Sequence, residues 1–233
     1  MSFADAWFDG SATLEGVAAH RLDDPGALPQ ACAAAAAIPL LICTLEEALA
    51  AVDWAALVDA RMRKRTRAED QRGLAPLVIG CGPGFVAGGN VDVAVETNWG
   101  AALGRVIRAG ATQALAGEPK SIAGVGRERL VYAAGEGRWE AVKEIGAAVA
   151  AGEMAARLGG QPVAAPIAGT VRGTVRSGVA VAAGTKVLEI DPRPPAQSRF
   201  HGLGERPRRI AEGVAEALSE TAAAGPRRAD VQG

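Results

Sequence analysis

A glycine-rich stretch between residues 82 and 89 is the first feature of the sequence that could do chemistry. It reads Gly82-Pro83-Gly84-Phe85 and then, after two residues, Gly88-Gly89. Glycines let a backbone approach an anion closely, and the N–H groups of such a turn can hold a phosphate. The stretch is neither a GxGxxG motif nor a Walker loop. An ordinary tight turn is therefore the alternative that the spacing leaves open.

Polar side chains at the end of the next predicted strand could complete an anion site. The run 92–98 alternates like a strand, and its last three residues could hydrogen-bond a pterin or a base edge, or could cap the turn at Gly100. Arg105 could add a bidentate contact to a phosphate. The full set that we expect to contact the ligand is Gly82, Gly84, Phe85, Gly88, Gly89, Glu96, Thr97, Asn98, Arg105, Lys64 and Arg65.

Lys64 and Arg65 belong to a basic run at 61–67. Such a run is usually a solvated loop. This one follows a predicted strand at the same sheet edge as the glycine loop, so it could also contact a phosphate or a partner. Both interpretations stay open.

Cys81 directly precedes the glycine loop and is the candidate nucleophile. A thiolate close to backbone N–H groups would be activated, although a buried and inert thiol is the simpler interpretation. The chain has three cysteines without CxxC spacing and two histidines. This composition does not favour a structural metal site, and we expect none.

The first half of the sequence alternates strand and helix signals. The apolar runs 38–43, 55–60 and 76–81 are typical of buried strands. Thr44 with a Glu three residues later is a capping-box pattern, which predicts a helix to about Val52. Apolar strands separated by helices predict a parallel α/β layer, a truncated Rossmann-like fold. In such sheets, ligands collect beyond the carboxyl ends of the strands.

The second half contains an internal repeat with an offset of 32 residues. The glycines at 137, 146 and 152 recur at 169, 178 and 184. Short β-prone pieces between glycines predict a small sandwich or barrel, and two such units should pack on each other with pseudo-twofold symmetry. The joint between them, residues 158–162, has no lysine. We therefore expect no covalently attached biotin or lipoate.

These patterns divide the chain into three parts and give the fold class α/β plus all-β. We expect an α/β domain with the anion-binding loop at 1–118, a lipoyl- or biotinyl-like barrel-sandwich domain at 119–195, and a C-terminal helix and tail at 196–233. In the last part, Ile210, Val214 and Leu218 recur every four residues, which predicts an amphipathic helix over 209–224.

Composition excludes some classes of function. Hydrophobic residues make up 49% and charged residues 22% of the chain, enough for a packed core. The net charge is −1, which argues against a nucleic-acid footprint over the whole chain. No apolar run reaches the roughly 20 residues of a membrane span, and residues 1–10 show no secretion signal. We expect a cytoplasmic protein without nucleic-acid or membrane partners.

Several blocks of the sequence resemble one family, the YqeB-type accessory proteins of selenium-dependent molybdenum hydroxylase systems. The blocks occur in the family's order and include residues 75–80, 82–85, 95–98, 103–107, 160–163 and 190–193. The resemblance runs from about Glu15 to Leu218. Three departures stand out: nothing before Gly10 matches the family's GGGD-type loop, Cys81 replaces a usual leucine, and Glu205-Arg206 replaces a usual Asp-Lys pair.

The resemblance implies a pathway rather than a defined reaction. It implies a maturation factor for molybdenum hydroxylases of the xanthine-dehydrogenase type, which binds the molybdenum cofactor (molybdopterin) or its nucleotide form as cargo. The partners would be a small pterin phosphate and an apo molybdenum hydroxylase. Two alternatives stay open, so the chain is not assigned as an enzyme. One is transfer of sulfur or selenium to the cofactor through Cys81, and the other is a scaffold without a ligand.

Overall fold

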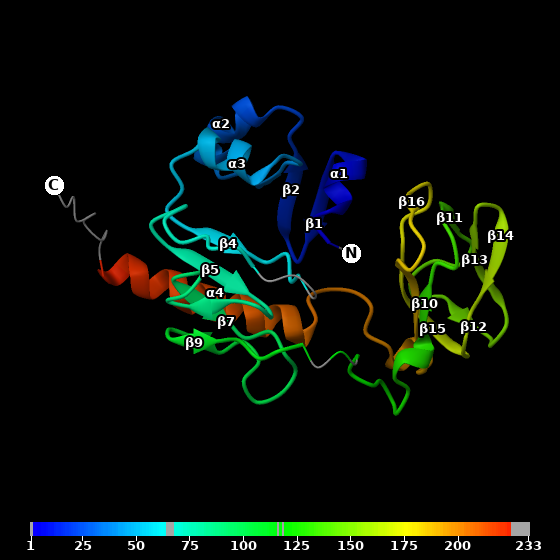
Figure 1. Cartoon of the computed structure of the whole chain (residues 1–233). Coiled ribbons are helices and arrows are strands. Elements are labelled where there is room, and N and C mark those ends of the chain that lie inside the picture. The colour runs from blue at the N-terminus through cyan, green and yellow to red at the C-terminus, as the bar shows by residue number, and fades with distance from the viewer. Residues whose placement is uncertain (1, 64–67, 116, 118, 225–233) are drawn as a thin grey trace. The chain divides into compact units, whose positions relative to one another are not determined.

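The computed structural model describes residues 2–63, 68–115, 117 and 119–224. The chain is a mixed α/β protein with several β-sheets and a C-terminal helix (Figure 1). It divides into two compact units: unit 1 comprises residues 1–116 and 202–233, and unit 2 comprises residues 117–201. No helix in the described ranges is both long enough and apolar enough to cross a lipid bilayer.

Unit 1 begins with a small sheet in the order β1-β2-β3. β1 (Ser11–Leu14) and β2 (Val17–Arg21) form a hairpin, and β3 (Ile38–Leu40) pairs with β2 in parallel. The helices of this segment are α1 (Asp5–Asp9), η1 (Pro25–Ala27), α2 (Leu28–Ala34) and α3 (Leu45–Ala51). The capping box that opens α3 is confirmed, because Thr44 and Glu47 exchange both hydrogen bonds.

The prediction of a buried strand over 38–43 is wrong. The strand ends at Leu40 and lies in the small sheet. The side chains of Ile38 and Ile42 are 42% and 65% exposed. A short apolar run cannot by itself show which sheet it joins or whether it is covered.

The main sheet of unit 1 has the strand order β4-β5-β7-β8. β4 (Leu57–Asp59), β5 (Val78–Cys81) and β7 (Val93–Val95) are parallel, as the sequence predicts, and β8 (Val106–Ile107) runs antiparallel to β7. Two short strands, β6 (Val86–Ala87) and β9 (Gly110–Ala111), form a separate ribbon.

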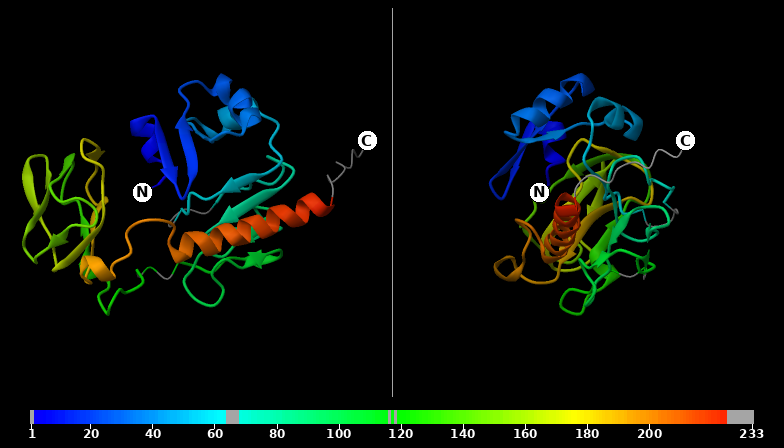
Figure 2. Two further views of the ribbon diagram at one scale, coloured as in Figure 1. Left: turned by 180° about the vertical axis from the view of Figure 1, so that it is seen from behind. Right: turned by 90° about the vertical axis from the view of Figure 1, so that its left-hand side faces the viewer.

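One face of the main sheet is covered by the C-terminal helix α4 (Glu205–Ala224), which Figure 2 shows lying along the sheet. The core on this face joins Leu77, Ile79, Cys81, Val95 and Val106 to Ile210, Val214 and Ala217. Ile210 and Val214 of the predicted helical face therefore pack on the sheet, whereas Leu218 is 39% exposed and Ala217 takes its place in the core. The helix also begins four residues earlier than predicted. No described residue between β4 and β7 is helical, so the expected crossover helices of this sheet are replaced by α4.

Two glycines allow α4 to lie close to the sheet. A Cβ on Gly213 would overlap the carbonyl oxygen of Gly104 and lie 3.0 Å from Val95 Cγ1. A Cβ on Gly104, whose φ is +83°, would overlap the backbone of Arg209. The helix and the loop between β7 and β8 thus meet backbone to backbone.

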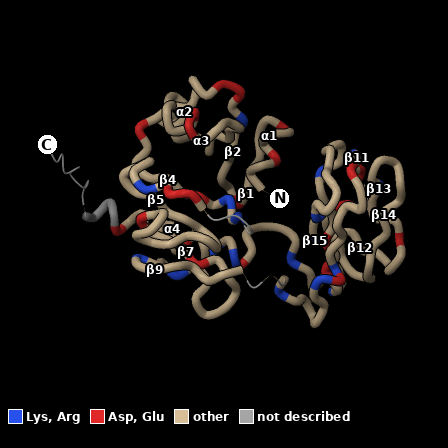
Figure 3. Tube along the Cα trace, in the orientation of Figure 1, with Lys and Arg blue, Asp and Glu red and all other residues tan. Residues whose placement is uncertain are grey.

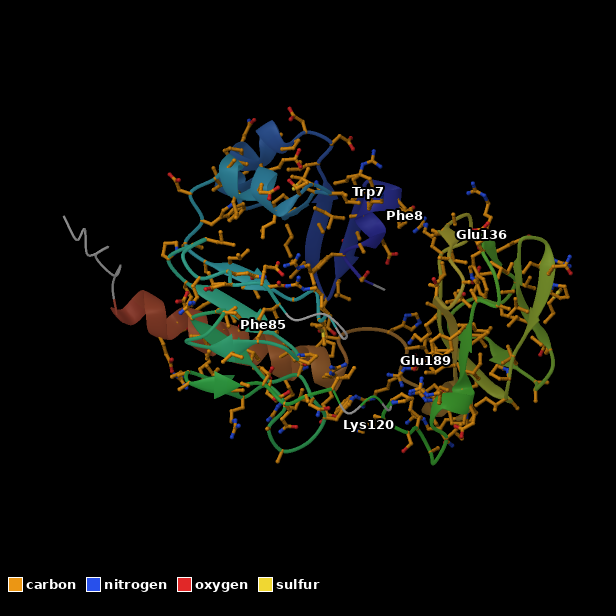
Figure 4. The ribbon with its side chains drawn as sticks, in the orientation of Figure 1. Trp7, Phe8, Phe85, Lys120, Glu136 and Glu189 are labelled. Atoms are coloured by element: carbon orange, nitrogen blue, oxygen red, sulfur yellow. The ribbon has the colours of Figure 1, made fainter. Side chains whose placement is uncertain are left out.

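The opposite face of the main sheet is covered by the chain that follows β5. Phe85, labelled in Figure 4, is 2% exposed and packs with Val78, Ala94 and Ile107. A Cβ on Gly80 would overlap the Phe85 ring. The ring therefore rests directly on the backbone of β5.

Unit 2 consists of two antiparallel four-stranded sheets. One has the order β10-β17-β15-β12 and the other β14-β13-β11-β16. The strands of the first are β10 (Leu130–Tyr132), β17 (Lys186–Asp191), β15 (Gly169–Thr174) and β12 (Ala148–Val149). Those of the second are β14 (Gln161–Ala164), β13 (Met154–Leu158), β11 (Gly137–Ala141) and β16 (Ala180–Val181). Two 3-10 helices, η2 (Arg127–Arg129) and η3 (Pro195–Gln197), flank these strands in the sequence.

The predicted duplication in unit 2 is confirmed by the strand order. A shift of 32 residues turns β11, β12 and β13 into β15, β16 and β17, within a residue at each end. When each strand of one sheet is replaced by its counterpart in the other copy, the order β10-β17-β15-β12 becomes β14-β13-β11-β16, which is the order of the second sheet. Each sheet therefore takes two strands from each copy. Among the described strands, no sheet closes into a barrel.

Trp139 lies at the centre of the core of unit 2. Trp139 is fully buried and belongs to the same hydrophobic core cluster as Val171, Leu188 and Ile190. Its Nε1 donates a hydrogen bond of 2.9 Å to Thr174 Oγ1. This single bond satisfies the polar atom of the largest side chain in the core.

Candidate functional site

The carboxyl ends of three strands lie at one edge of the main sheet, because β4, β5 and β7 are parallel. Asp59 ends β4, Gly82 follows β5 and Glu96 follows β7. Ligands of open α/β sheets bind beyond such an edge. We call the region made of residues 59–63, 82–85 and 96–98 the carboxyl edge.

Asp59 is a buried charge at the carboxyl edge, with a side chain that is 2% exposed. Arg61 donates to Asp59 from its backbone N–H, from Nε and from Nη2. Gln71 Nε2 donates to Asp59 Oδ2 at 2.7 Å. Burial raises the pKa of Asp59, but the hydrogen bonds from Arg61 and Gln71 outweigh burial and hold this pKa well below its usual value.

The first two arginines of the basic run are already paired. Arg61 and Arg63 both contact Asp59, and both also donate to Glu69. Figure 3 shows residues of both charge signs where the chain leaves β4. These two arginines therefore balance two carboxylates. Lys64 and Arg65, the expected phosphate contacts of this run, lie outside the described residues.

Gly82 and Gly84 begin the glycine loop at the carboxyl edge. The N–H of the buried Gly82 donates to Val95 O at 3.3 Å. Gly84 is exposed and has a φ of +88°. No described residue accepts a hydrogen bond from the N–H of Gly84. A side chain at this position would strain the backbone, because the φ of Gly84 is positive.

Asn90 holds this loop in shape, a role that the sequence pattern did not indicate. Its Oδ1 accepts from Val86 N at 2.8 Å, and its Nδ2 donates to Gly84 O at 3.0 Å and to Ala68 O at 3.1 Å. Asn90 is buried. The conformation of the loop around Gly84 thus depends on a side chain six residues later.

Gly88 and Gly89 lie in a different place, in the turn that leads into the amino end of β7. The N–H of Gly88 donates to Val91 O and that of Gly89 to Val86 O, each at 2.9 Å. The carbonyl of Gly88 accepts from Arg72. The structure therefore does not bring the two pairs of glycines into one cradle. Phe85, between them, faces the core.

Glu96 has its two carboxylate oxygens occupied. Oε1 accepts from the backbone N–H groups of Thr97 and Asn98, and Oε2 accepts from that of Gln113, at 2.7 to 2.8 Å. The residue is 1% exposed. Glu96 therefore ties two loops together rather than facing outward. The Asn98 amide is also engaged, because its Nδ2 donates to Gln113 Oε1.

Arg206, at the start of α4, reaches the carboxyl edge. Its Nε donates to Thr97 O at 2.8 Å. The amino end of the 20-residue helix α4 is thereby fixed beside the end of β7. Sequence reasoning missed this residue as a site component. The available signal was that Glu205-Arg206 keeps the charges of the Asp-Lys pair usual in the resembling family.

Arg105 is exposed and makes no ion pair with any described residue. Its backbone carbonyl accepts from Glu96 N at 3.0 Å. Its side chain lines a shallow groove of about 340 Å³ beside α4, together with Arg209, Glu212 and Glu216. None of the predicted glycine contacts lines this groove, and its two carboxylates oppose an anion.

Cys81 faces α4 in the core and is 1% exposed. Burial, with a smaller contribution from the charge of Asp59, raises the pKa of the Cys81 thiol to about 11. A thiol of this kind is protonated at neutral pH and is not within reach of a solvent-borne substrate. The geometry therefore favours the inert interpretation of Cys81. No group of three or more His, Cys, Asp or Glu in the described part of the chain could hold a metal ion.

No family model matches the chain. It is 35% identical over 221 residues to a protein of Escherichia coli strain K12 named Uncharacterized protein YqeB, and the match covers 94% of this chain. The chain is similar to YqeB. The matched part is 40% of the E. coli protein, so the chain spans about two fifths of the length of this curated relative. The similarity supports the YqeB-type resemblance of the sequence blocks, while the relative's name assigns no function.

A solved structure, the product-bound Ectoine utilization protein EutE (DoeB) from Ruegeria pomeroyi, matches 36% of this chain and 27% of its own. The identity is 24% and the TM-score is 0.26. At this TM-score the match assigns neither a fold nor a function to the chain.

Proposed function

We propose that the chain is an accessory factor in the maturation of molybdenum hydroxylases of the xanthine-dehydrogenase type. In this proposal, unit 1 binds molybdopterin or its nucleotide form as cargo, and the chain presents it to an apo-hydroxylase. The ordered blocks that resemble the YqeB-type accessory proteins support the pathway. The 35% identity to E. coli YqeB supports the resemblance itself and does not bear on molybdenum.

The proposal includes a finer description of the fold. Unit 1 is a truncated Rossmann-like layer, and unit 2 is a lipoyl- or biotinyl-like barrel-sandwich domain without its carrier lysine. The turn that joins the two copies contains Gly159 and Gly160 and no lysine. An intact mass free of biotinyl or lipoyl groups is the expected result.

The observation that carries the proposal is the set of donors at the carboxyl edge. Gly84 exposes an N–H without an acceptor among the described residues, and Arg206 lies beside Thr97 at the amino end of α4. Neutral N–H donors, a helix N-terminus and an arginine are the groups that hold phosphate in proteins. Asp59 and Glu69 are paired with Arg61 and Arg63, so their charges are largely compensated towards an incoming anion.

Titration calorimetry with a pterin phosphate tests the proposal. Arg206→Gln should weaken binding about tenfold, as expected for loss of a hydrogen bond to a charged group. Arg208→Gln is the matched control. Arg208 lies on the same helix, but its guanidinium lies near a carboxylate, 3.9 Å from Glu15 Oε2, so this variant should bind like wild type. Arg206 is preferable to Gly84 as the test residue, because any side chain at Gly84 would strain the loop.

Two outcomes would contradict the proposal. Equal affinity in wild type and Arg206→Gln would place the ligand away from the carboxyl edge. Absence of binding by wild type would favour a scaffold without a ligand. A thermal melt of each variant shows whether the fold is intact.

A further inference from the structure

Unit 2 carries a cluster of charged side chains on the sheet β10-β17-β15-β12. Its members are two carboxylates, Glu189 and Asp191, and four cations, Arg129, Arg172, Lys186 and Arg193. We call this group the Glu189 cluster. Figure 3 shows charges of both signs gathered beside β15, and Figure 4 labels Glu189 among these side chains.

The two carboxylates lie beneath the cations and hold them. The side chain of Glu189 is 17% exposed and that of Asp191 is 0% exposed. Burial raises the pKa of Glu189, but Lys186 and Arg129 outweigh burial and hold it below its usual value. Hydrogen bonds from Arg193 hold the pKa of Asp191 below its usual value. Both are negative at neutral pH, so the four cations leave two positive charges uncompensated.

Three of the cations face solvent. The side chains of Arg172, Lys186 and Arg193 are 39%, 49% and 36% exposed. No carboxylate among the described residues pairs with them except the two of the cluster. A molecule that approaches this surface therefore meets positive charge first.

Arg129 has one donor that is not used. Its side chain is 6% exposed, Nη1 donates to Glu189, and Nη2 donates to Lys120 O at 2.9 Å. Nε is buried and has no hydrogen-bond partner. Nε and Nη2 form the edge of a guanidinium that a carboxylate takes with two parallel hydrogen bonds. A carboxylate that displaced Lys120 O would satisfy both donors.

The duplicated fold supplies an internal comparison. At the positions 32 residues earlier, Glu140 corresponds to Arg172, Arg157 to Glu189, and Met154 to Lys186. The corresponding sheet forms with the same strand order, and its register sets Glu140 opposite Arg157. The positions of Lys186, Asp191 and Arg193 are occupied there by Met154, Gly159 and Gln161. The fold of unit 2 therefore does not require charges at these three positions.

We propose that the Glu189 cluster is a docking surface for an acidic segment of a partner protein. The fork of an arginine matches a carboxylate, and the buried acids hold the cations in place, so little side-chain freedom is lost on binding. A nucleic acid fits less well, because the chain's net charge is −1 and the cluster offers few excess charges. This inference is independent of the phosphate site proposed in unit 1.

Fluorescence anisotropy of a fluorescein-labelled hexaglutamate peptide with the full chain tests the proposal. Wild type should bind saturably, and added salt should weaken binding because the contacts are charged. The double variant Arg172→Gln/Lys186→Gln should bind about tenfold more weakly. The matched control Arg138→Gln/Arg157→Gln removes the same charge from the other sheet of unit 2 and should change affinity by less than about twofold.

The alternative outcomes are distinct. Equal weakening in the two double variants would indicate attraction to overall charge and would overturn the proposal, as would the absence of saturable binding by wild type. Displacement of the peptide by a short DNA duplex or by inorganic phosphate at lower concentration than by unlabelled hexaglutamate would also overturn it. Should Arg172→Gln/Lys186→Gln melt earlier than wild type, the single variant Lys186→Gln provides the same comparison at a residue that is half exposed.

Discussion

Arg61 holds Asp59, two residues before it, through hydrogen bonds from its backbone N–H and Nε to Oδ1 and from Nη2 to Oδ2. Arg72 holds Asp70 in the same way, and Arg193 holds Asp191. The three Asp-x-Arg pairs share one local geometry but differ in burial. Asp59 and Asp191 have almost no exposed side chain, whereas that of Asp70 is 54% exposed.

Asp59→Asn should destabilise unit 1 by about 1–3 kcal/mol at pH 7, because buried donors lose a charged acceptor. The folded pKa of Asp59 lies below its unfolded value of about 3.9. Its contribution is therefore fully present above about pH 4 and is lost as pH falls further towards the folded pKa. Urea unfolding of wild type and variant across about pH 2–8 measures this, and their difference should shrink only below about pH 4.

Asp70→Asn is the matched control for this experiment, because it changes the same residue type in the same local geometry at an exposed site. Exposed ion pairs contribute little to stability, so its unfolding curve should follow that of wild type. A loss of stability equal to that of Asp59→Asn would contradict the role given to burial.

Gly213→Ala should destabilise the chain by about 1–3 kcal/mol, the usual range for overpacking. Helix propensity alone would favour alanine by about 1 kcal/mol. The contact with the backbone of Gly104 outweighs that preference, since neither backbone can move without shifting α4. At the exposed Ala215 the reverse substitution, Ala215→Gly, should lower stability only by the difference in helix propensity between alanine and glycine. Thermal unfolding followed by circular dichroism compares them, and a stabilised Gly213→Ala would contradict the close packing.

Gly80→Ala and Phe85→Leu should each destabilise unit 1, but the double variant should lose less than the sum. The methyl group introduced by Gly80→Ala would occupy the place of the Phe85 ring, and the smaller leucine side chain of Phe85→Leu leaves room for it. Residues in direct contact show such coupling in double-mutant cycles. Urea unfolding of the two single variants and the double variant measures the coupling. Additive losses would mean that the ring does not rest on Gly80.

Cys81 should resist alkylation in the folded chain. With its pKa near 11, about one thiol in a thousand is ionised at pH 8. Cys32 and Cys43 are partly exposed and should react with iodoacetamide first. Mass spectrometry of the peptides gives the order, and unfolding in urea should remove the difference. Rapid modification of Cys81 in the native chain would restore the sulfur-transfer hypothesis.

Local and periodic signals made part of this structure predictable. The capping box at Thr44 acts within four residues, and the duplication in unit 2 repeats the same glycines at a constant offset. The parallel strands β4, β5 and β7 follow from short apolar runs in sequence order. Each of these features depends on residues close in the sequence or on a regular repeat.

The remaining features depend on contacts between distant residues. The position of α4 depends on the close approach of Gly104 and Gly213, and no sequence pattern links these two glycines. The contact of Arg206 with Thr97 also joins residues that are far apart in the sequence. The glycine stretch was predicted as one cradle because its residues are adjacent. In the structure Asn90 bonds back to Val86 and Gly84, and the N–H of Gly88 donates to Val91 O within the following turn. Adjacency in sequence does not determine which edge of a sheet a residue reaches.

Because the two copies of unit 2 exchange strands, neither copy can complete its sheet without the other. Each sheet combines two strands of one copy with two of the other, so one copy alone has no complete sheet and no second layer for its core. A fragment ending at Gly160 would need a second molecule of itself to bury Trp139, and we expect it to be unfolded or to assemble as a homodimer. The turn at Gly159 and Gly160 joins the two copies in one chain, so that they pair without a second molecule.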